Sequence, residues 1–78
     1  MESIEVIARF NEQGQIDPVS FIRAGRSYHV DSVGRRWEDD FGQHFLVMVP
    51  FERVFELLYV RPESRWYLKR VGMDRFSG

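Results

Sequence analysis

The sequence predicts an all-β domain of about six antiparallel strands in a meander, folded as a small SH3-like barrel or as a strongly curled single sheet. Hydrophobic residues recur with a period of two along most of the chain, and turn-forming residues separate these runs at short intervals. The 78 residues suffice for one domain, and seven Phe, three Tyr and two Trp supply the bulk that so small a core needs. We therefore expect a single domain over residues 1–78, with a frayed tail from about residue 73.

The first two strands are separated by a polar turn. Apolar residues alternate from Ile4 to Phe10, and residues 11–14 read Asn-Glu-Gln-Gly, which is typical of a turn. A second run covers Ile16 to Arg23. Because proline cannot donate a ladder hydrogen bond, Pro18 marks either a sheet edge or the true start of pairing. The Ile4–Phe10 strand and the Pro18 strand are therefore the candidate exposed edges.

Ala24-Gly25 predicts a tight hairpin between the second and third runs. A two-residue loop there places Phe21 opposite Tyr28 and Val19 opposite Val30, and such cross-strand pairs stabilise a ladder.

The third run, from Arg26 to Trp37, changes phase along its length. Tyr28 and Val30 share one parity, whereas Val33 and Trp37 share the other. Gly34 lies within this slip, which indicates a β-bulge or a sharp bend that curls the sheet.

Three further strands are predicted after an exposed loop at residues 38–42: Gln43 to Val49, Arg53 to Arg61, and Arg65 to Val71. The apolar run 54–60 also fits a short helix by periodicity, but its β-branched and aromatic content favours a strand. Turn lengths and patterning fix the register. The expected pairs are Tyr59 with Trp66, Leu57 with Leu68, Glu56 with Lys69, Val54 with Val71, Val49 with Arg53, Val47 with Phe55 and Phe45 with Leu57.

Composition excludes several classes of protein. The net charge is −1, so no global field draws the chain to nucleic acid or to an anionic membrane. There is no cysteine for disulfides or nucleophilic catalysis, and no apolar run approaches the ~20 residues of a membrane span. The amino terminus lacks the pattern of a signal peptide, so we expect a cytoplasmic protein with no membrane association.

No residue pattern indicates an enzyme. His29 and Asp31 share one side of a strand, and His44 on a later strand completes a set that can bind iron or zinc. Strand alternation produces such sets by chance, which favours histidines that are satisfied internally or face solvent. The acids Glu38, Asp39 and Asp40 are adjacent in a loop, where carboxylates are usually just solvated. No phosphate-binding glycine motif is present either. We expect a protein without catalytic residues, metal or cofactor.

Arginine beside aromatic residues marks a candidate binding surface. Arg35 and Arg36 precede Trp37, and a second basic group surrounds Trp66 and Tyr67. Single-strand-binding barrels combine a cationic groove with aromatic platforms in this way. In the alternative interpretation the tryptophans belong to the core and the arginines pair with nearby acids. The candidate surface consists of Arg35, Arg36, Trp37, Arg61, Arg65 and Arg70, with Lys69 beside them.

A family resemblance rests on residues from most of the chain. The residues are Phe21, Gly25-Arg26, Tyr28, Val30, Val33, Trp37, Phe55-Glu56-Leu57, Trp66-Tyr67-Leu68 and Arg70-Val71. This pattern resembles a family of short bacterial proteins of unknown function, over about residues 4 to 74. Similar segments accompany the Y-family-polymerase-like proteins of the bacterial mutagenesis response. The family is often richer in tryptophan across the segment that matches 38–43, where this chain has none. The resemblance implies an accessory module with a DNA-repair context, and it assigns no site residue.

Two functional hypotheses follow. The first is a non-catalytic interaction module that binds a protein partner or itself through an exposed edge strand. The second is a single-stranded nucleic-acid-binding module that uses Arg35, Arg36 and Trp37 with the last hairpin. Whether an aromatic ring is exposed beside the arginines distinguishes the two.

Overall fold

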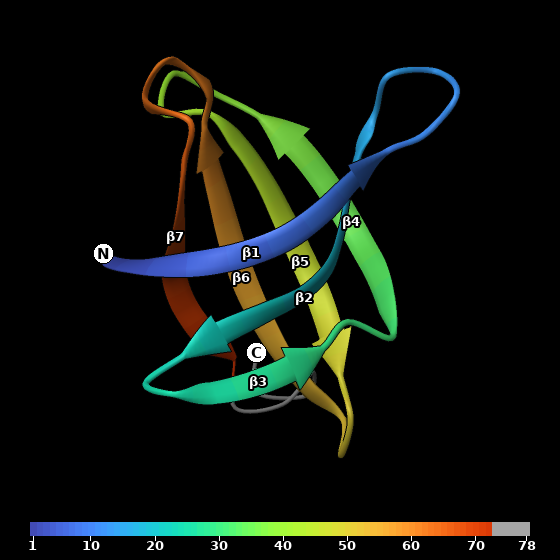
Figure 1. Cartoon of the computed structure of the whole chain (residues 1–78), viewed down its shortest axis with the longest axis vertical. Coiled ribbons are helices and arrows are strands. Elements are labelled where there is room, and N and C mark those ends of the chain that lie inside the picture. The colour runs from blue at the N-terminus through green and yellow to red at the C-terminus, as the bar shows by residue number, and fades with distance from the viewer. Residues whose placement is uncertain (73–78) are drawn as a thin grey trace.

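A computed structural model describes residues 1–72, with side chains through residue 69, and confirms the all-β prediction (Figure 1). Seven antiparallel strands form one curled sheet, a half-barrel, in the order β3-β2-β1-β7-β6-β5-β4. The tail that we expected to fray from about residue 73 lies outside the described residues. The strands are β1 (Glu2–Phe10), β2 (Ile16–Arg23), β3 (Arg26–His29), β4 (Ser32–Glu38), β5 (Gln43–Val49), β6 (Arg53–Val60) and β7 (Arg65–Gly72), with a short 3-10 turn, η1 (Arg61–Glu63).

The third run of the sequence forms two strands rather than one. It breaks at Val30 and Asp31, whose backbone N–H groups donate to the carbonyls of Val19 and Met48 respectively. The two residues thus link β2 to β5, and they let β3 and β4 lie at opposite edges of the sheet. Val30 itself is buried in the core.

Gly34 is the bulged residue of β4, as predicted, because the β4–β5 register shifts between Val33 and Arg35. The bulge changes which face each following residue occupies. Val33 packs against the core, whereas Trp37 lies opposite His44 on the outer face. The predicted shared phase of Val33 and Trp37 is therefore wrong, because the bulge falls between them.

The N-terminal hairpins follow the predicted pairing. Ala24 and Gly25 both adopt positive φ (51° and 76°), the conformation of a tight two-residue hairpin turn. Phe21 lies opposite Tyr28, with the two rings stacked 5.0 Å apart. Pro18 lies opposite Ala8, beside a register shift, in the part of β2 that has no partner on β3.

The C-terminal meander keeps most of the predicted register. A bulge between Glu56 and Leu57 makes two predicted pairs wrong. Glu56 lies opposite Arg70 rather than Lys69, and Val54 lies opposite Gly72 rather than Val71. Lys69 is the extra residue on β7, and its Nζ still lies 3.7 Å from Glu56 Oε2. The other expected pairs of this meander form as predicted.

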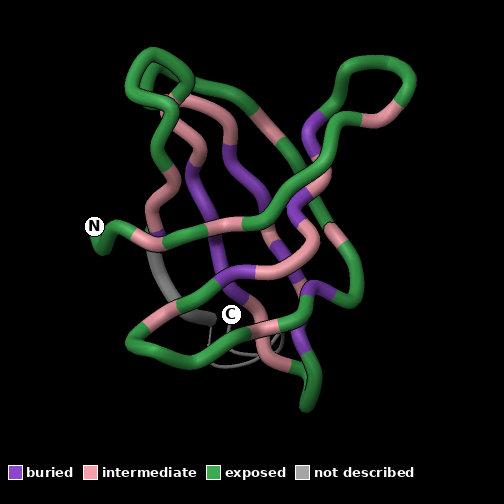
Figure 2. The backbone as a smooth tube through the Cα atoms, in the orientation of Figure 1, coloured by how far each residue is buried: buried purple, intermediate pink, exposed green. Residues whose placement is uncertain are grey.

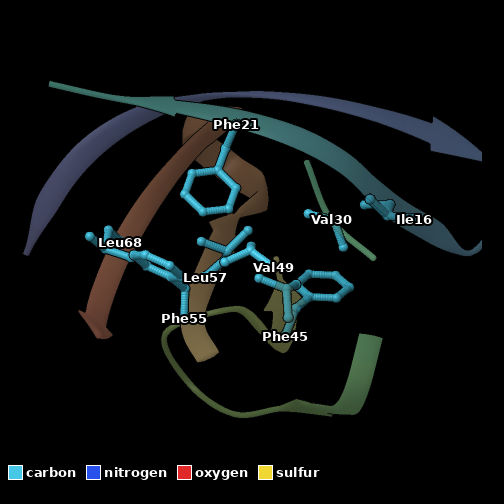
Figure 3. Packing of buried hydrophobic residues seen from close by; sticks show 9 residues of the cluster. Ile16, Phe21, Val30, Phe45, Val49, Phe55, Leu57 and Leu68 are labelled. Carbon is cyan, nitrogen blue, oxygen red and sulfur yellow. The ribbon is translucent and has the colours of Figure 1, made fainter. Parts of the chain in front are cut away.

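The core lies between two layers. β1 and β2 cross over the strands β4 to β7, and burial is concentrated along β5 and β6 (Figures 1 and 2). Phe21 points from β2 toward Leu57 and Phe55 of β6 (Figure 3). The buried cluster consists of Ile16, Phe21, Val30, Phe45, Val47, Val49, Phe55, Leu57 and Leu68.

Candidate functional site

The predicted basic surface is divided in the structure. Arg35 and Trp37 share the outer face of β4, with the guanidinium carbon 4.8 Å from the indole centroid. Arg65 is exposed at the start of β7, three strands away in the sheet. Arg61 lies on η1, over the ring of Tyr59 at 5.9 Å. The side chain of Arg70 lies outside the described residues.

Arg36 points to the opposite face, where two nitrogens of its guanidinium bind other parts of the fold. Its Nη1 donates to the carbonyl of Ile16, and its Nη2 to Asp17 Oδ1, both at 2.6 Å. These contacts join β4 to β2 across the mouth of the half-barrel. Two guanidinium nitrogens of Arg36 are thus occupied within the fold, although its side chain is still 37% exposed, and its place in a binding surface stays a prediction.

The tryptophans do not form the exposed platforms of a single-strand binder. Trp66 packs inward, with its ring 4.9 Å from Tyr59 and 5.4 Å from Phe45. Trp37 is half-buried and stacks on the buried ring of His44. The most exposed aromatic rings of the described chain are Phe10, Phe41 and Phe51, none of which belongs to the predicted basic surface.

His44 joins two carboxylates beneath Trp37. Its Nδ1 lies 3.0 Å from Glu56 Oε2, and its Nε2 lies 2.8 Å from Asp39 Oδ1, although this second contact is not aligned with a ring N–H. Both ring nitrogens thus face carboxylate oxygens. The contact with His44 lowers the pKa of Asp39, and the backbone N–H groups of Phe41 and Gly42 lower it further.

The carboxylate of Asp39 anchors the 38–42 loop to His44. Asp39 Oδ1 also accepts hydrogen bonds from the N–H groups of Phe41 and Gly42. Across the described part of the chain, no three His, Cys, Asp or Glu side chains are grouped to hold a metal ion. His29 is exposed and lies 3.9 Å from Asp31. The sequence contains a signal for this cluster, because strand alternation places His44 and Glu56 on the outer face of two paired strands.

The backbone of β1 is open along one edge. β7 pairs with β1 only at Glu2, Ser3 and Ile4, whereas β2 pairs with residues 5–10. The N–H of Val30 donates to the carbonyl of Val19, so the backbone groups of Val19 point away from β1. Successive residues of an antiparallel strand bond to opposite sides, and Ser20 and Ile22 therefore bond toward β1.

The same alternation identifies which residues of β1 face the open edge. Ser20 lies opposite Ile7, so the odd-numbered residues of β1 bond toward β2. Beyond the bulge, Asn11 N–H donates to Gln15, which keeps this parity. Val6, Ala8 and Phe10 therefore direct their backbone groups away from β2, toward an edge with no partner among residues 1–72.

A row of inward side chains lies beside this open edge. Cross-strand pairs connect Ile4 to Trp66, Trp66 to Tyr59, and Tyr59 to Gln43, across β7, β6 and β5. Tyr59 and Trp66 are only half-buried. Figure 1 shows β1 crossing in front of β6 and β5, with both strands continuing past it. The open edge thus lies above a partly covered aromatic floor.

A hollow lies at the far end of this row. It is lined by Gln15, Ile16, Arg36, Trp37, Glu38, Gln43, His44 and Phe45. Ile16 is the cross-strand partner of Phe10, and Gln43 is the partner of both Tyr59 and Glu38. Two lining residues of the hollow are thus cross-strand neighbours of Phe10 at the end of β1 and of Tyr59 at the end of the aromatic row. We call the open edge, the Tyr59–Trp66 floor and this hollow together the β1 trough.

Comparisons with protein families, curated proteins and solved structures return no match to this chain. The resemblance to a mutagenesis-associated family stays a prediction. Within residues 1–72, no helix combines the length and apolar character required to cross a bilayer.

Proposed function

We propose that this protein is a non-catalytic interaction module that accepts an extended segment of a protein partner along the open edge of β1. The observation that carries the proposal is the unpaired backbone of Val6, Ala8 and Phe10 beside the half-buried rings of Tyr59 and Trp66. An added strand gains main-chain hydrogen bonds from such an edge, and it gains selectivity from the surface beneath its alternate side chains.

The open stretch of β1 is only partly protected against strand addition, because its charged residues Glu5 and Arg9 alternate with Val6, Ala8 and Phe10, whose backbone groups face the open edge. Native edges are blunted by charges, prolines or short length. β3 has only four residues, and β4 carries Arg35, Arg36 and Glu38. β1 instead exposes Ile7 by 58% and Phe10 by 70%, with Ala8 between them. The open stretch of β1 is therefore better suited to pairing than the edge strands β3 and β4.

An extended segment fits this edge better than a second copy of the domain. Strands β5 and β6 continue beyond β1 on its open side (Figure 1). A two-fold pairing of β1 with β1 would bring the β4–β7 layers of both copies into the same space. A single strand without its own second layer avoids this overlap. We therefore favour a protein partner over self-association.

The test uses the alternation of backbone groups along β1. The probe is a soluble synthetic peptide of alternating threonine and valine, with hydrogen exchange followed by NMR. Bound peptide should slow exchange of the amides of Val6, Ala8 and Phe10, whereas the amides of Ile7 and Arg9 already bond to β2. Protection without this alternation, or none at saturating peptide, would contradict the proposal.

Two variants sharpen the result. Ala8→Pro removes one N–H on the open side and leaves the β2 ladder intact, because the N–H of Ala8 points away from β2. Ala8→Lys keeps the N–H but places a charge on the inner face of β1, next to the added strand. Both should weaken peptide binding. A thermal unfolding curve for each variant confirms that the fold is retained.

A single-stranded nucleic-acid binder is the second candidate. It is favoured by the stacking of Arg35 on Trp37 on the outer face of the sheet. Arg65 lies on the same outer face, because side chains alternate along β7 and Trp66 points inward. The net charge of −1 and the engagement of Arg36 weigh against it. A DNA-repair context has the sequence resemblance as its sole support.

A further inference from the structure

The hollow at the end of the β1 trough has an acidic rim. Glu38 lines it, and Asp39 and Asp40 follow in the adjoining loop. Arg36 also lines the hollow, but Asp17 Oδ1 and the Ile16 carbonyl occupy its guanidinium at 2.6 Å. The positive charge of Arg36 is thus compensated within the protein, and the charge of Glu38 remains to face an incoming group.

Gln43 supplies a second acceptor at the same place. Its Oε1 is buried and has no hydrogen-bond partner among the described residues. Buried polar atoms nearly always have such a partner, so an unsatisfied one needs an explanation. Gln43 lies between Tyr59 and Glu38 in the cross-strand row, where the floor of the trough meets the hollow. Gln43 also lines the hollow, so its unsatisfied oxygen is an acceptor beside that space.

The remaining lining suits the stem of a long side chain. Ile16 and Phe45 are buried apolar residues, and both line the hollow. Lysine and arginine place their methylene groups on apolar surface while the charged end reaches polar atoms. An anionic group is disfavoured here, because the one cation that could meet it, Arg36, already holds Asp17.

We propose that the segment accepted by β1 carries a basic side chain that enters this hollow and is held by Glu38 and Gln43. This inference rests on the proposed function, since the strand paired with Val6, Ala8 and Phe10 delivers the side chain. The partner is thus an extended protein segment with alternating apolar residues and a lysine or arginine at the end that lies over β4.

The experiment compares two sets of synthetic peptides that share an alternating threonine–valine sequence. One set carries a lysine at each position in turn, and the other carries glutamine at the same positions. Dissociation constants come from fluorescence anisotropy of labelled peptides. At one position, lysine should bind about fivefold more tightly than glutamine, the size expected of a partly exposed ion pair. Added salt should reduce this preference.

Three variants separate the inference from the function on which it rests. Glu38→Gln should abolish the lysine preference, whereas Glu12→Gln, in the exposed turn after β1, should keep it. Ala8→Pro should weaken both peptide sets. Equal binding of lysine and glutamine peptides, with Glu38→Gln without effect, would overturn the basic-residue inference and leave strand capture standing. Absence of peptide binding to the folded wild-type protein would overturn both.

Discussion

The indole of Trp37 lies parallel to the imidazole of His44, with 4.9 Å between the ring centroids and an angle of 4° between the planes. His44 is almost fully buried although it lies on the outer face of β5. Trp37 therefore acts as a cover for a polar cluster, and this explains why an aromatic residue beside two arginines is only half-exposed.

Removal of this cover should destabilise the domain. Trp37→Ala exposes His44 to water and loses the stacked contact, so we expect a loss of about 2 kcal/mol, below the range for a fully buried tryptophan. Trp37→Phe keeps an aromatic cover and should recover most of the loss. Urea unfolding followed by circular dichroism measures both. Equal stability of Trp37→Ala and wild type would show that the cover contributes nothing.

Acid should weaken the anchoring of the 38–42 loop. The contact with His44 lowers the pKa of Asp39 below its ordinary value of 3.8. A carboxylate with a lowered folded-state pKa adds stability above its unfolded pKa, and this stability is lost as pH falls through the folded value. Unfolding free energies of wild type and Asp39→Asn across acidic pH give the comparison. The wild type should lose more stability below about pH 4, and parallel curves would contradict the assignment.

Gly42 holds the same loop against β6. Its φ is +152°, and a Cβ there would overlap the backbone carbonyl of Tyr59. Gly42→Ala should cost about 2 kcal/mol or more, because the backbone itself must move. Gly34→Ala is the matched control, since its Cβ would meet Leu46 O at 3.8 Å, an ordinary contact. Thermal unfolding of the two variants should show a large loss only for Gly42→Ala.

The β5–β6 turn stores strain that a substitution can release. Phe51 and Glu52 adopt positive φ (70° and 59°), and Phe51 is 89% exposed. Phe51→Gly should raise stability by about 1 kcal/mol, because glycine adopts this conformation without steric cost. Phe41→Gly removes another exposed ring, but at a residue without positive φ, and should give no such gain. Calorimetric melting temperatures distinguish the two outcomes.

Nucleic-acid binding can be decided by titration with labelled single- and double-stranded oligonucleotides at low and physiological salt. We expect no saturable binding, since the predicted arginines are divided between two faces and Arg36 is engaged. Tight binding at low salt that Trp37→Ala weakens would reverse this order. Its log–log salt slope would then be about −0.7 for each phosphate neutralised on a single strand.

Local patterns in the sequence sufficed for the strands and most of their register. Period-two alternation, the Ala24-Gly25 turn and the Gly34 bulge were each visible in the sequence and each occurs in the structure. The β7 bulge was not predictable, because Glu56 and Lys69 form an attractive pair in either register. The break at Val30 and Asp31 was missed because it depends on long-range hydrogen bonds to Val19 and Met48.

The candidate site was harder to predict than the fold. Ile4–Phe10 was expected as an exposed edge, but the sequence does not show that β7 leaves β1 after Ile4. The contacts of Arg36 with Ile16 and Asp17 could not be predicted, because they form only when the half-barrel closes. Alternation along one strand gives a residue's face, whereas closure of the sheet decides what that face meets.

The two-residue link of Val30 and Asp31 joins strands that lie at opposite ends of the sheet order. The link therefore closes the curled sheet covalently, because the edge strands β3 and β4 cannot separate where the chain joins them. A protein cut between these residues would keep every strand pairing, and the core contact of Phe21 with Phe55 and the ion pair of Arg36 with Asp17 would then have to hold it curled.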